Sequence, residues 1–340
     1  MRTVLLAAGL LLGAAASAGA QQAHLLVVAG LGGDPTYREQ FHAWATTLVE
    51  AATARYDLPP ERITYLGEDP ELDPERIAGR STRENIAAAV DALAEGSASG
   101  DHVVIVLFGH GSESGAPRVN LPGRDLAADD YAGLLDRLDG RRITFVNTAS
   151  ASGPFVESLS GPDRLVMTAT RSGREWNAAL FGGHFVDAFA DGESDADVNK
   201  DGRVSMLEAF TYARLRVAQA YEAEGLLLTE HALLDDNGDG AGALEPDPLE
   251  GDGRMARTLF LTSGEATASA MAFPDDPELR PLYDERAALE ARVEELRGLR
   301  GGLDAEQYER QLQTLLVEIA LKSREIRRLE AARGVPEEGR

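Results

Sequence analysis

The sequence predicts an α/β fold: a three-layer sandwich around a mostly parallel six-stranded sheet, followed by a C-terminal helical hairpin. Two observations support this prediction. Short runs rich in valine, isoleucine and leucine alternate with amphipathic stretches, which is typical of a parallel sheet covered by helices. From about residue 277 the composition changes to leucine, glutamate, arginine and alanine, which are strong helix formers.

The elements of the α/β part follow from the alternation of apolar runs and amphipathic stretches. Strands are expected at residues 24–29, 63–66, 102–108, 143–147, 164–169 and 258–261. Helices are expected at residues 37–54, 82–93, 128–138, 176–190 and 207–222. The first of these helices has apolar side chains at helical spacing, and the second begins at a Ser/Thr cluster that suits an N-cap.

Residues 277–335 are predicted to form two helices joined by a turn at residues 301–302, which are both glycine. In the second helix, side chains spaced by four and three residues indicate a coiled-coil seam that contains one lysine. The seam consists of Tyr308, Leu312, Leu315, Ile319, Lys322, Ile326 and Leu329. The first helix has leucines one heptad apart, at Leu282, Leu289 and Leu296. We expect this hairpin either to pack on the α/β part or to self-associate with another copy of the chain.

Residues 1–20 have the pattern of a secretory signal peptide: Arg2, an apolar run over residues 4–16, and small residues before Gln21. We therefore expect an exported protein, periplasmic or secreted, whose mature chain begins near Gln21. The apolar run is shorter than the roughly 20 residues that a membrane-spanning helix needs, and no later run is long enough. Because the chain has no cysteine, it has no disulfides.

The chain is strongly acidic, with a formal net charge of −24. This charge argues against nucleic-acid binding, because a polyphosphate would be repelled. Most of the charged side chains are expected to form a solvated surface that keeps the protein soluble. The acidity also suits a calcium-rich compartment outside the cytoplasm.

Polar and small residues follow two of the predicted strands at the point where each strand ends. His110 and Gly111 come directly after the strand at residues 102–108. The strand at residues 143–147 ends in Asn-Thr-Ala-Ser-Ala-Ser-Gly, residues 147–153. Since ligands bind at the carboxyl ends of the strands in open α/β sheets, these two segments form the candidate site.

The two segments resemble those of the legumain family in the caspase-like clan of cysteine peptidases. In that family a His-Gly after one strand supplies the base, and a cysteine after the next strand, preceded by an acid and a small residue, is the nucleophile. The resemblance covers most of residues 23–190, including Arg38, which matches an arginine of the family's primary specificity pocket, and the pair Arg174 and Glu175. It implies a caspase-haemoglobinase-like domain over residues 21–270, with His110 and Gly111 in its site.

The nucleophile of the legumain family is missing from this chain. The match places Asn147 at the family's acid, Thr148 at its small residue and Ala149 at its cysteine. Alanine has no attacking atom, so covalent catalysis as the family performs it is lost. The family's preference for asparagine is not matched either, since Trp176 and Asn177 stand near its pocket serines.

Three functions are therefore open. The first is a non-catalytic relative that keeps the cleft and binds a peptide or protein partner. The residues expected to contact this partner are Arg38, Asn147 and Trp176. The second is an active peptidase or hydrolase in which Ser150 or Ser152 attacks with His110 as the base, although a serine at either place points differently from the missing thiol. The third is an envelope scaffold that acts through the C-terminal hairpin.

Residues 197–208 match an EF-hand-type calcium loop, D-x-N-x-D-G-x-x-x-x-x-E, which wraps Ca²⁺ with alternating oxygen ligands. The expected ligands are Asp197, Asn199, Asp201, the Arg203 carbonyl, Ser205 and Glu208. A second loop at residues 235–246 begins in the same way, with Asp235, Asn237 and Asp239, but has Pro246 at its twelfth place. This second loop is either an irregular calcium site or an Asp/Asn/Gly turn.

Overall fold

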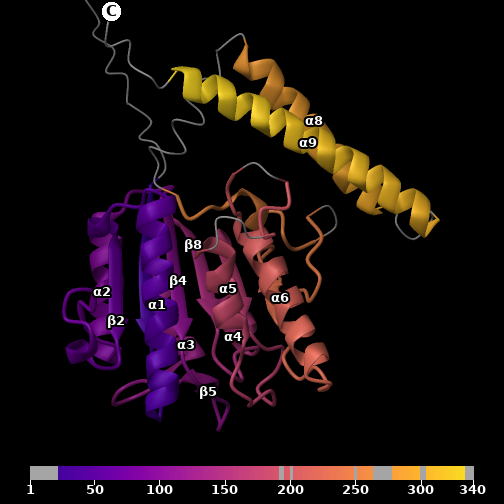
Figure 1. Ribbon diagram of the computed structural model, residues 1–340. Helices are drawn as coiled ribbons and strands as arrows, with labels where there is room; N and C mark the ends of the chain where they lie inside the picture. The colour runs from indigo at the N-terminus through magenta and orange to yellow at the C-terminus, as the bar shows by residue number, and fades with distance from the viewer. Residues whose placement is uncertain are drawn as a thin grey trace, which may run out of the picture.

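The computed structural model describes residues 22–190, 195–199, 202–248, 251–262, 278–298 and 304–333. The predicted signal peptide, Asp201 and the turn at residues 301–302 lie outside these ranges. The chain folds into an α/β domain and a pair of long C-terminal helices (Figure 1). Among the described residues, none of the helices has the length and apolar composition needed to cross a membrane.

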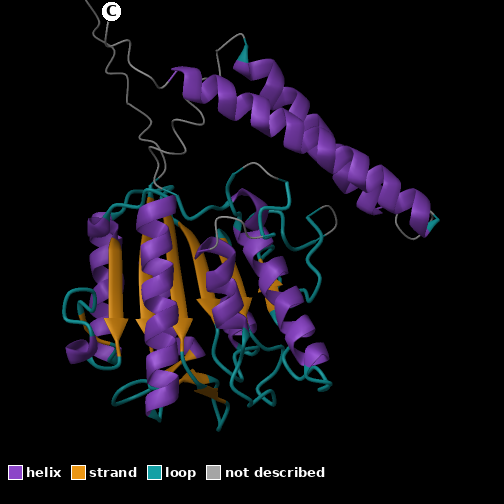
Figure 2. Cartoon of the chain, viewed as in Figure 1, coloured by secondary structure: helices purple, strands orange, loops and turns teal. Residues whose placement is uncertain are grey.

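The α/β domain is built around a seven-stranded sheet with the strand order β10-β9-β8-β4-β1-β2-β3 (Figure 2). The strands are β1 Ala23–Ala29, β2 Ile63–Gly67, β3 Gly79–Arg80, β4 His102–Phe108, β8 Arg142–Asn147, β9 Arg164–Thr168 and β10 Leu233–Asp235. Every neighbouring pair is parallel except β9 and β10. The central strands β1 and β4 are buried over their whole length, which explains their continuous apolar sequences. The prediction of a mostly parallel sheet is confirmed.

Two features of the sheet differ from the sequence prediction. The sheet has seven strands instead of six, because the short strands β3 and β10 extend its two edges. The strand predicted at residues 258–261 is wrong: a 3₁₀ turn covers Ala256–Thr258, and Phe260 makes an isolated bridge to Ser205. The place beside β9 is taken by β10, and Leu259 and Leu261 are buried in the core instead. The apolar character of these residues therefore reflects their burial in the core, not pairing in the sheet.

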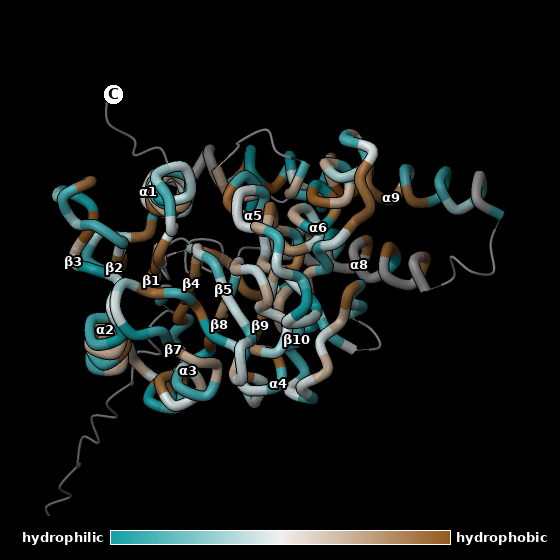
Figure 3. Tube along the Cα trace, turned by 90° about the horizontal axis from the view of Figure 1, so that it is seen from below, coloured by the Kyte–Doolittle hydropathy of each residue, from teal (hydrophilic) through white to brown (hydrophobic). Residues whose placement is uncertain are grey.

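Helices cover both faces of the sheet (Figure 3). One apolar cluster is buried on each side of the sheet. The helices on one face are α1 Pro35–Arg55, α5 Phe181–Ala190 and α6 Met206–Ala223. Those on the other face are α2 Arg83–Gly96, α3 Ala128–Leu135 and α4 Phe155–Leu159. The helix predicted from residue 176 begins later, at Phe181. The Leu180 and Phe181 N–H groups both donate to the buried Glu230 carboxylate at 2.8 Å, and this pair of bonds closes the first turn of α5.

The remaining short elements lie in the connections. After β4, the strands β5 Gly111–Ser112, β6 Arg118–Val119 and β7 Leu126–Ala127 form a small antiparallel sheet. This small sheet lies at the end toward which the arrowheads of the main sheet point (Figure 1). The other 3₁₀ turns are Pro60–Arg62, Pro70–Leu72 and Asp136–Leu138.

The C-terminal helices α8 Leu279–Gly298 and α9 Ala305–Arg333 pack side by side. Their shared apolar cluster contains Val293 and Leu296 from α8, and Leu315 and Ile319 from α9. The lysine in the predicted seam, Lys322, reaches across to Glu285 on α8, with 2.6 Å between Nζ and the carboxylate. The seam of α9 is thus used within the chain. Self-association through the outer surface of the hairpin stays a prediction.

Candidate functional site

His110 lies between the end of β4 and the start of β5, at the carboxyl edge of the main sheet. Its ring packs edge-on against Tyr37 and Phe41 of α1, with ring centroids 4.5 Å and 5.2 Å apart. Burial lowers the pKa of His110, while the charge of Asp34 and a hydrogen bond to the Gly32 carbonyl partly oppose this shift. The imidazole is therefore neutral at pH 7, which is the form that can accept a proton or a hydrogen bond.

Asn147 and Ala149, which the sequence predicts to belong to the candidate site, are buried at the end of β8. Asn147 ends the strand, and its side-chain oxygen accepts a hydrogen bond from the Ala149 N–H at 3.1 Å. The Asn147 side-chain nitrogen has no hydrogen-bond partner in the described part of the chain. The Ala149 methyl group lies next to Gly111, since a Cβ atom added to Gly111 would be 3.4 Å from it. The structure thus brings residue 149 beside Gly111.

The two serines of this loop are hydrogen-bonded to the protein around them. The Ser150 hydroxyl accepts from the Gly111 N–H at 3.2 Å and donates to the Gly111 carbonyl at 3.3 Å. The Ser152 hydroxyl bonds the Thr170 hydroxyl and accepts from the Thr170 N–H, both at 3.2 Å. Across the residues that the structure describes, no hydrogen bond joins His110 to either serine. The structure therefore gives both hydroxyls a role in tying loops together.

Arg38 extends from the first turns of α1 toward the end of β2. Its guanidinium forms an ion pair with Glu68 at 2.9 Å, and this partner raises the pKa of Arg38. The second carboxylate oxygen of Glu68 accepts from the Gly32 N–H at 2.9 Å. One side of the Arg38 guanidinium is thus occupied by its ion pair with the buried Glu68 carboxylate.

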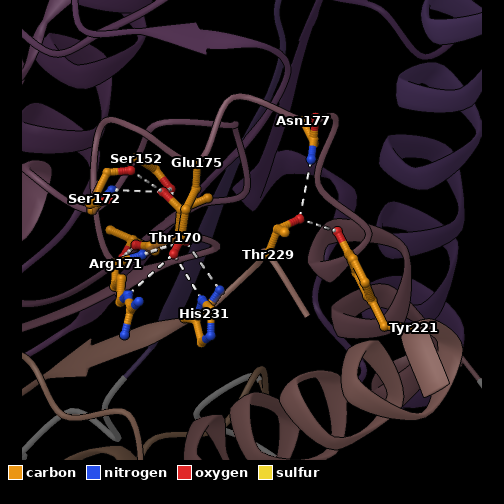
Figure 4. Close-up of polar contacts among 11 residues, drawn as sticks. Ser152, Thr170, Arg171, Ser172, Glu175, Asn177, Tyr221, Thr229 and His231 are labelled. Atoms are coloured by element: carbon orange, nitrogen blue, oxygen red, sulfur yellow. Dashed lines mark hydrogen bonds and ion pairs between the residues drawn. The ribbon is translucent and has the colours of Figure 1, made fainter. Parts of the chain in front are cut away.

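A pocket of about 740 Å³ opens beside the 149–153 loop, between residues 171–177 and residues 228–231. Its two walls are joined by polar contacts, in which Glu175 faces His231, and Asn177 meets Thr229 (Figure 4). The Glu175 carbonyl accepts from the Ala151 N–H at 2.8 Å, so the pocket wall is also tied to the loop that contains Ala149. The pocket and the His110 segment therefore border the same loop.

The Glu175 carboxylate is the centre of the polar contacts in this pocket. It accepts from the His231 ring at 2.8 Å and from the His231 and Arg171 N–H groups at 3.2 Å and 3.0 Å. It also pairs with the Arg171 guanidinium at 3.3 Å. Trp176 is a site residue predicted from the sequence, whereas His231 and Arg171 are not. No local motif marks His231, because its partner lies 56 positions away.

The first predicted calcium loop keeps several features of that motif in the described residues. The Asp197 carboxylate accepts from the Gly202 N–H at 2.9 Å, which joins the first and sixth positions of the loop. The Glu208 carboxylate accepts from the Val198 N–H at 3.2 Å and from the Ser205 N–H at 2.9 Å. Ser205 and Glu208 form a capping box at the start of α6. Asp201, at the fifth position, lies outside the described residues.

The second acidic loop takes a carboxylate from a residue that the motif did not include. Asp235 accepts from the Gly240 N–H at 2.8 Å, the same pairing of first and sixth positions. Asp252 accepts from the N–H groups of Asp236 and Asn237, the second and third positions of the loop, at 3.0 Å and 3.3 Å. In the first loop, Glu208 accepts from the N–H group at the second position. Burial raises the pKa of both Asp235 and Asp252. Within the described ranges, no group of three acidic, histidine or cysteine side chains converges closely enough to hold a metal ion.

Comparisons with known proteins give similarities of structure alone. No family model matches the chain, and no curated protein matches it. The chain is similar to the solved structure of protein GSU0716 from Geobacter sulfurreducens, with 13% identity, a TM-score of 0.45, and coverage of 71% of this chain and 99% of that one. It is also similar to caspase-1 from Spodoptera frugiperda, with 12% identity, a TM-score of 0.40, and coverage of 59% of this chain and 79% of that one.

Proposed function

We propose that this chain is an exported, legumain-like peptidase homologue that has lost catalysis and binds a peptide or protein partner at the carboxyl edge of its sheet. The single observation that carries this proposal is the position of Ala149. Its methyl group is buried beside Gly111, where the family has its thiol. On this proposal the chain keeps the cleft of that family but lacks the atom that would attack a carbonyl carbon.

The hydrogen bonds of Ser150 argue against the alternative of a serine hydrolase. An attacking hydroxyl must transfer its proton to a base, and His110 would have to be within hydrogen-bond reach. The Ser150 hydroxyl instead exchanges hydrogen bonds with both backbone groups of Gly111. Moving it to the imidazole would break both contacts and leave the Gly111 N–H without this partner.

The test of this function is a peptide library offered to residues 21–340 with calcium present, beside the variant His110→Ala. We expect no cleavage by either protein, and capture of a subset of the peptides by the wild-type protein. Fluorophosphonates should label neither the wild-type protein nor Ser150→Ala, because no serine is activated. Cleavage that disappears in His110→Ala, or labelling that disappears in Ser150→Ala, would instead show that a serine has replaced the thiol.

We propose further that the loop at residues 197–208 binds Ca²⁺ and that the ion fixes the segment that leads into α6. The support is the complete sequence match, together with the Asp197–Gly202 contact and the inward-facing Glu208 carboxylate. Carboxylate, amide and carbonyl oxygens are the ligands that Ca²⁺ prefers. The second loop is a weaker candidate, in which Asp252 would supply the carboxylate that Pro246 cannot.

Calcium is expected to raise the melting temperature of the wild-type protein by about 5–10 °C at a hundredfold excess over its Kd. Glu208→Gln keeps an acceptor for the capping box but removes the charge that binds the ion, so this variant should lose the rise. Glu222→Ala, an exposed position farther along α6, is the control and should keep it. Thermal unfolding with calcium or with a chelator measures the effect. An equal rise in wild-type protein and Glu208→Gln would place the ion elsewhere.

A further inference from the structure

The pocket between residues 171–177 and 228–231 contains an arginine, Arg174, for which no acidic partner is found among the described residues. Arg171 is paired with Glu175 at 3.3 Å. Arg174 is exposed on the same wall, and in the described part of the chain neither a carboxylate nor a carbonyl contacts its guanidinium. In a chain with 57 acidic and 33 basic residues, an unpaired arginine that lines a pocket is a distinctive place for an anionic group to bind.

The same pocket has an aromatic surface that is fixed in position but not covered. The Trp176 side chain is held by a hydrogen bond from its Nε1 to the Gly173 carbonyl at 2.5 Å. Nevertheless 74% of the residue is exposed, and Leu228 lines the opposite wall. An indole that is already oriented loses little conformational entropy when a ligand covers it, and it offers a large apolar contact area.

The walls around these two groups are held by the protein's own contacts. Asn177 donates to the Thr229 hydroxyl at 3.1 Å, and Tyr221 bonds the same hydroxyl at 3.3 Å. Glu175 holds the His231 ring, and its backbone carbonyl fixes Ala151. The pocket is therefore formed before any ligand enters. Arg38 is a weaker candidate than Arg174 for binding an anion, because the Arg38 guanidinium is already paired with Glu68.

We propose that this pocket binds a peptide carboxylate that lies next to an aromatic or apolar side chain. The carboxylate pairs with Arg174, whose planar guanidinium can donate two parallel hydrogen bonds. The neighbouring side chain covers Trp176 and contacts Leu228. This inference rests on the proposed peptide-binding function and names the group that the site selects. The carboxylate is either the C-terminus of a peptide or the side chain of an internal aspartate, and the experiment separates the two.

The test measures the binding of four synthetic peptides to residues 21–340 by calorimetry. Acetyl-Ala-Ala-Ala-Phe is offered with a free C-terminus and as the C-terminal amide. Acetyl-Ala-Phe-Asp-Ala-amide is offered beside its Asp-to-Asn counterpart. We expect one of the two carboxylate peptides to bind about tenfold tighter than its uncharged partner, since hydrogen bonds between two charged groups are stronger than those to a neutral amide. If the peptide with the free C-terminus is the one that binds more tightly, the carboxylate is a C-terminus; if the aspartate peptide is, the carboxylate is an internal side chain.

Two variants connect this difference to the pocket. Arg174→Gln should remove the tenfold difference while the uncharged peptide binds as before. Trp176→Ala should weaken the charged and uncharged peptides to a similar extent. Arg137→Gln removes the same charge from the opposite helical layer, where Arg137 pairs with Asp91 at 2.8 Å, and should change nothing.

The outcomes separate this inference from the function on which it rests. If charged and uncharged peptides bind equally, or if Arg174→Gln behaves like the wild-type protein, the carboxylate inference is overturned and peptide binding stands. If none of these four peptides binds, but peptides from the library do, the pocket is again excluded as the selective site. If no peptide of either set binds, the proposed function and this inference are both wrong.

Discussion

Replacing Gly111 by alanine is expected to lower the free energy of unfolding by about 3 kcal/mol, because overpacking of a closed site moves backbone atoms. A Cβ atom at Gly111 would overlap the Ser150 carbonyl oxygen. It would also lie 3.0 Å from the Arg118 carbonyl oxygen and 3.4 Å from the Ala149 methyl group. Two of these three contacts are backbone atoms, which cannot turn away as a flexible side chain can. Urea unfolding measures the loss.

The same substitution should also weaken capture of the library peptides, since it pushes the 149–153 loop away from His110. The control is Gly133→Ala. Gly133 lies within α3 and has open space where a Cβ atom would be, so alanine there should stabilise the protein by about 0.5–1 kcal/mol. If Gly111→Ala unfolds at the same urea concentration as the wild-type protein, residues 111 and 150 are not in the close contact described here.

Lowering the pH from 6.5 toward 4 is expected to remove about 3 kcal/mol of stability through His102 alone. His102 is buried where β4 begins. Its Nδ1 donates to the Phe260 carbonyl at 3.2 Å, and its Nε2 accepts from the Thr144 hydroxyl at 2.8 Å. Burial lowers the pKa of His102 from 6.5 to about 4. A protonated ring would lose its acceptor nitrogen and place an uncompensated charge in the core.

The sign of this effect follows from the lowered pKa of the folded state. Above pH 6.5 the ring is neutral in both the folded and unfolded states, so the stability that depends on a neutral His102 is fully present. Between pH 6.5 and about 4 the unfolded chain binds a proton that the folded protein rejects, so stability falls with the pH. Burial also lowers the pKa of His24 and of His110, which act in the same direction.

Urea unfolding at intervals between pH 7 and pH 4, with excess calcium, measures this effect. His102→Gln retains a donor and an acceptor but cannot titrate, so its stability should fall less steeply over this range than that of the wild-type protein. Comparing the slopes removes any constant cost of the substitution. His184→Gln, a change on α5 near the surface, is the matched control. Parallel slopes for wild-type protein and His102→Gln would contradict the prediction.

The site could be predicted from the sequence only where local pattern and position in the sheet coincide. His110 and Gly111 follow one long apolar strand and Asn147 ends the next. Because the carboxyl ends of parallel strands meet at one edge, these residues had to lie close together. His231 and Arg171 could not be found in this way. The contact between His231 and Glu175 spans 56 positions and depends on how the segment after α6 returns to the sheet.

The sequence by itself determined the buried strands β1, β4, β8 and β9, because a strand covered on both faces must be apolar along its length. It also determined that the chain contains no thiol and that α9 has a heptad pattern. Only the tertiary structure decided which segment completes the edge of the sheet, since the apolar residues 259–261 and β10 could both have paired with β9. It likewise decided that the seam of α9 faces α8 and that Asp252 joins the second acidic loop. Within the described residues, it also leaves Arg174 without an acidic partner. These outcomes depend on contacts between segments far apart in the chain, which no local spacing of residues encodes.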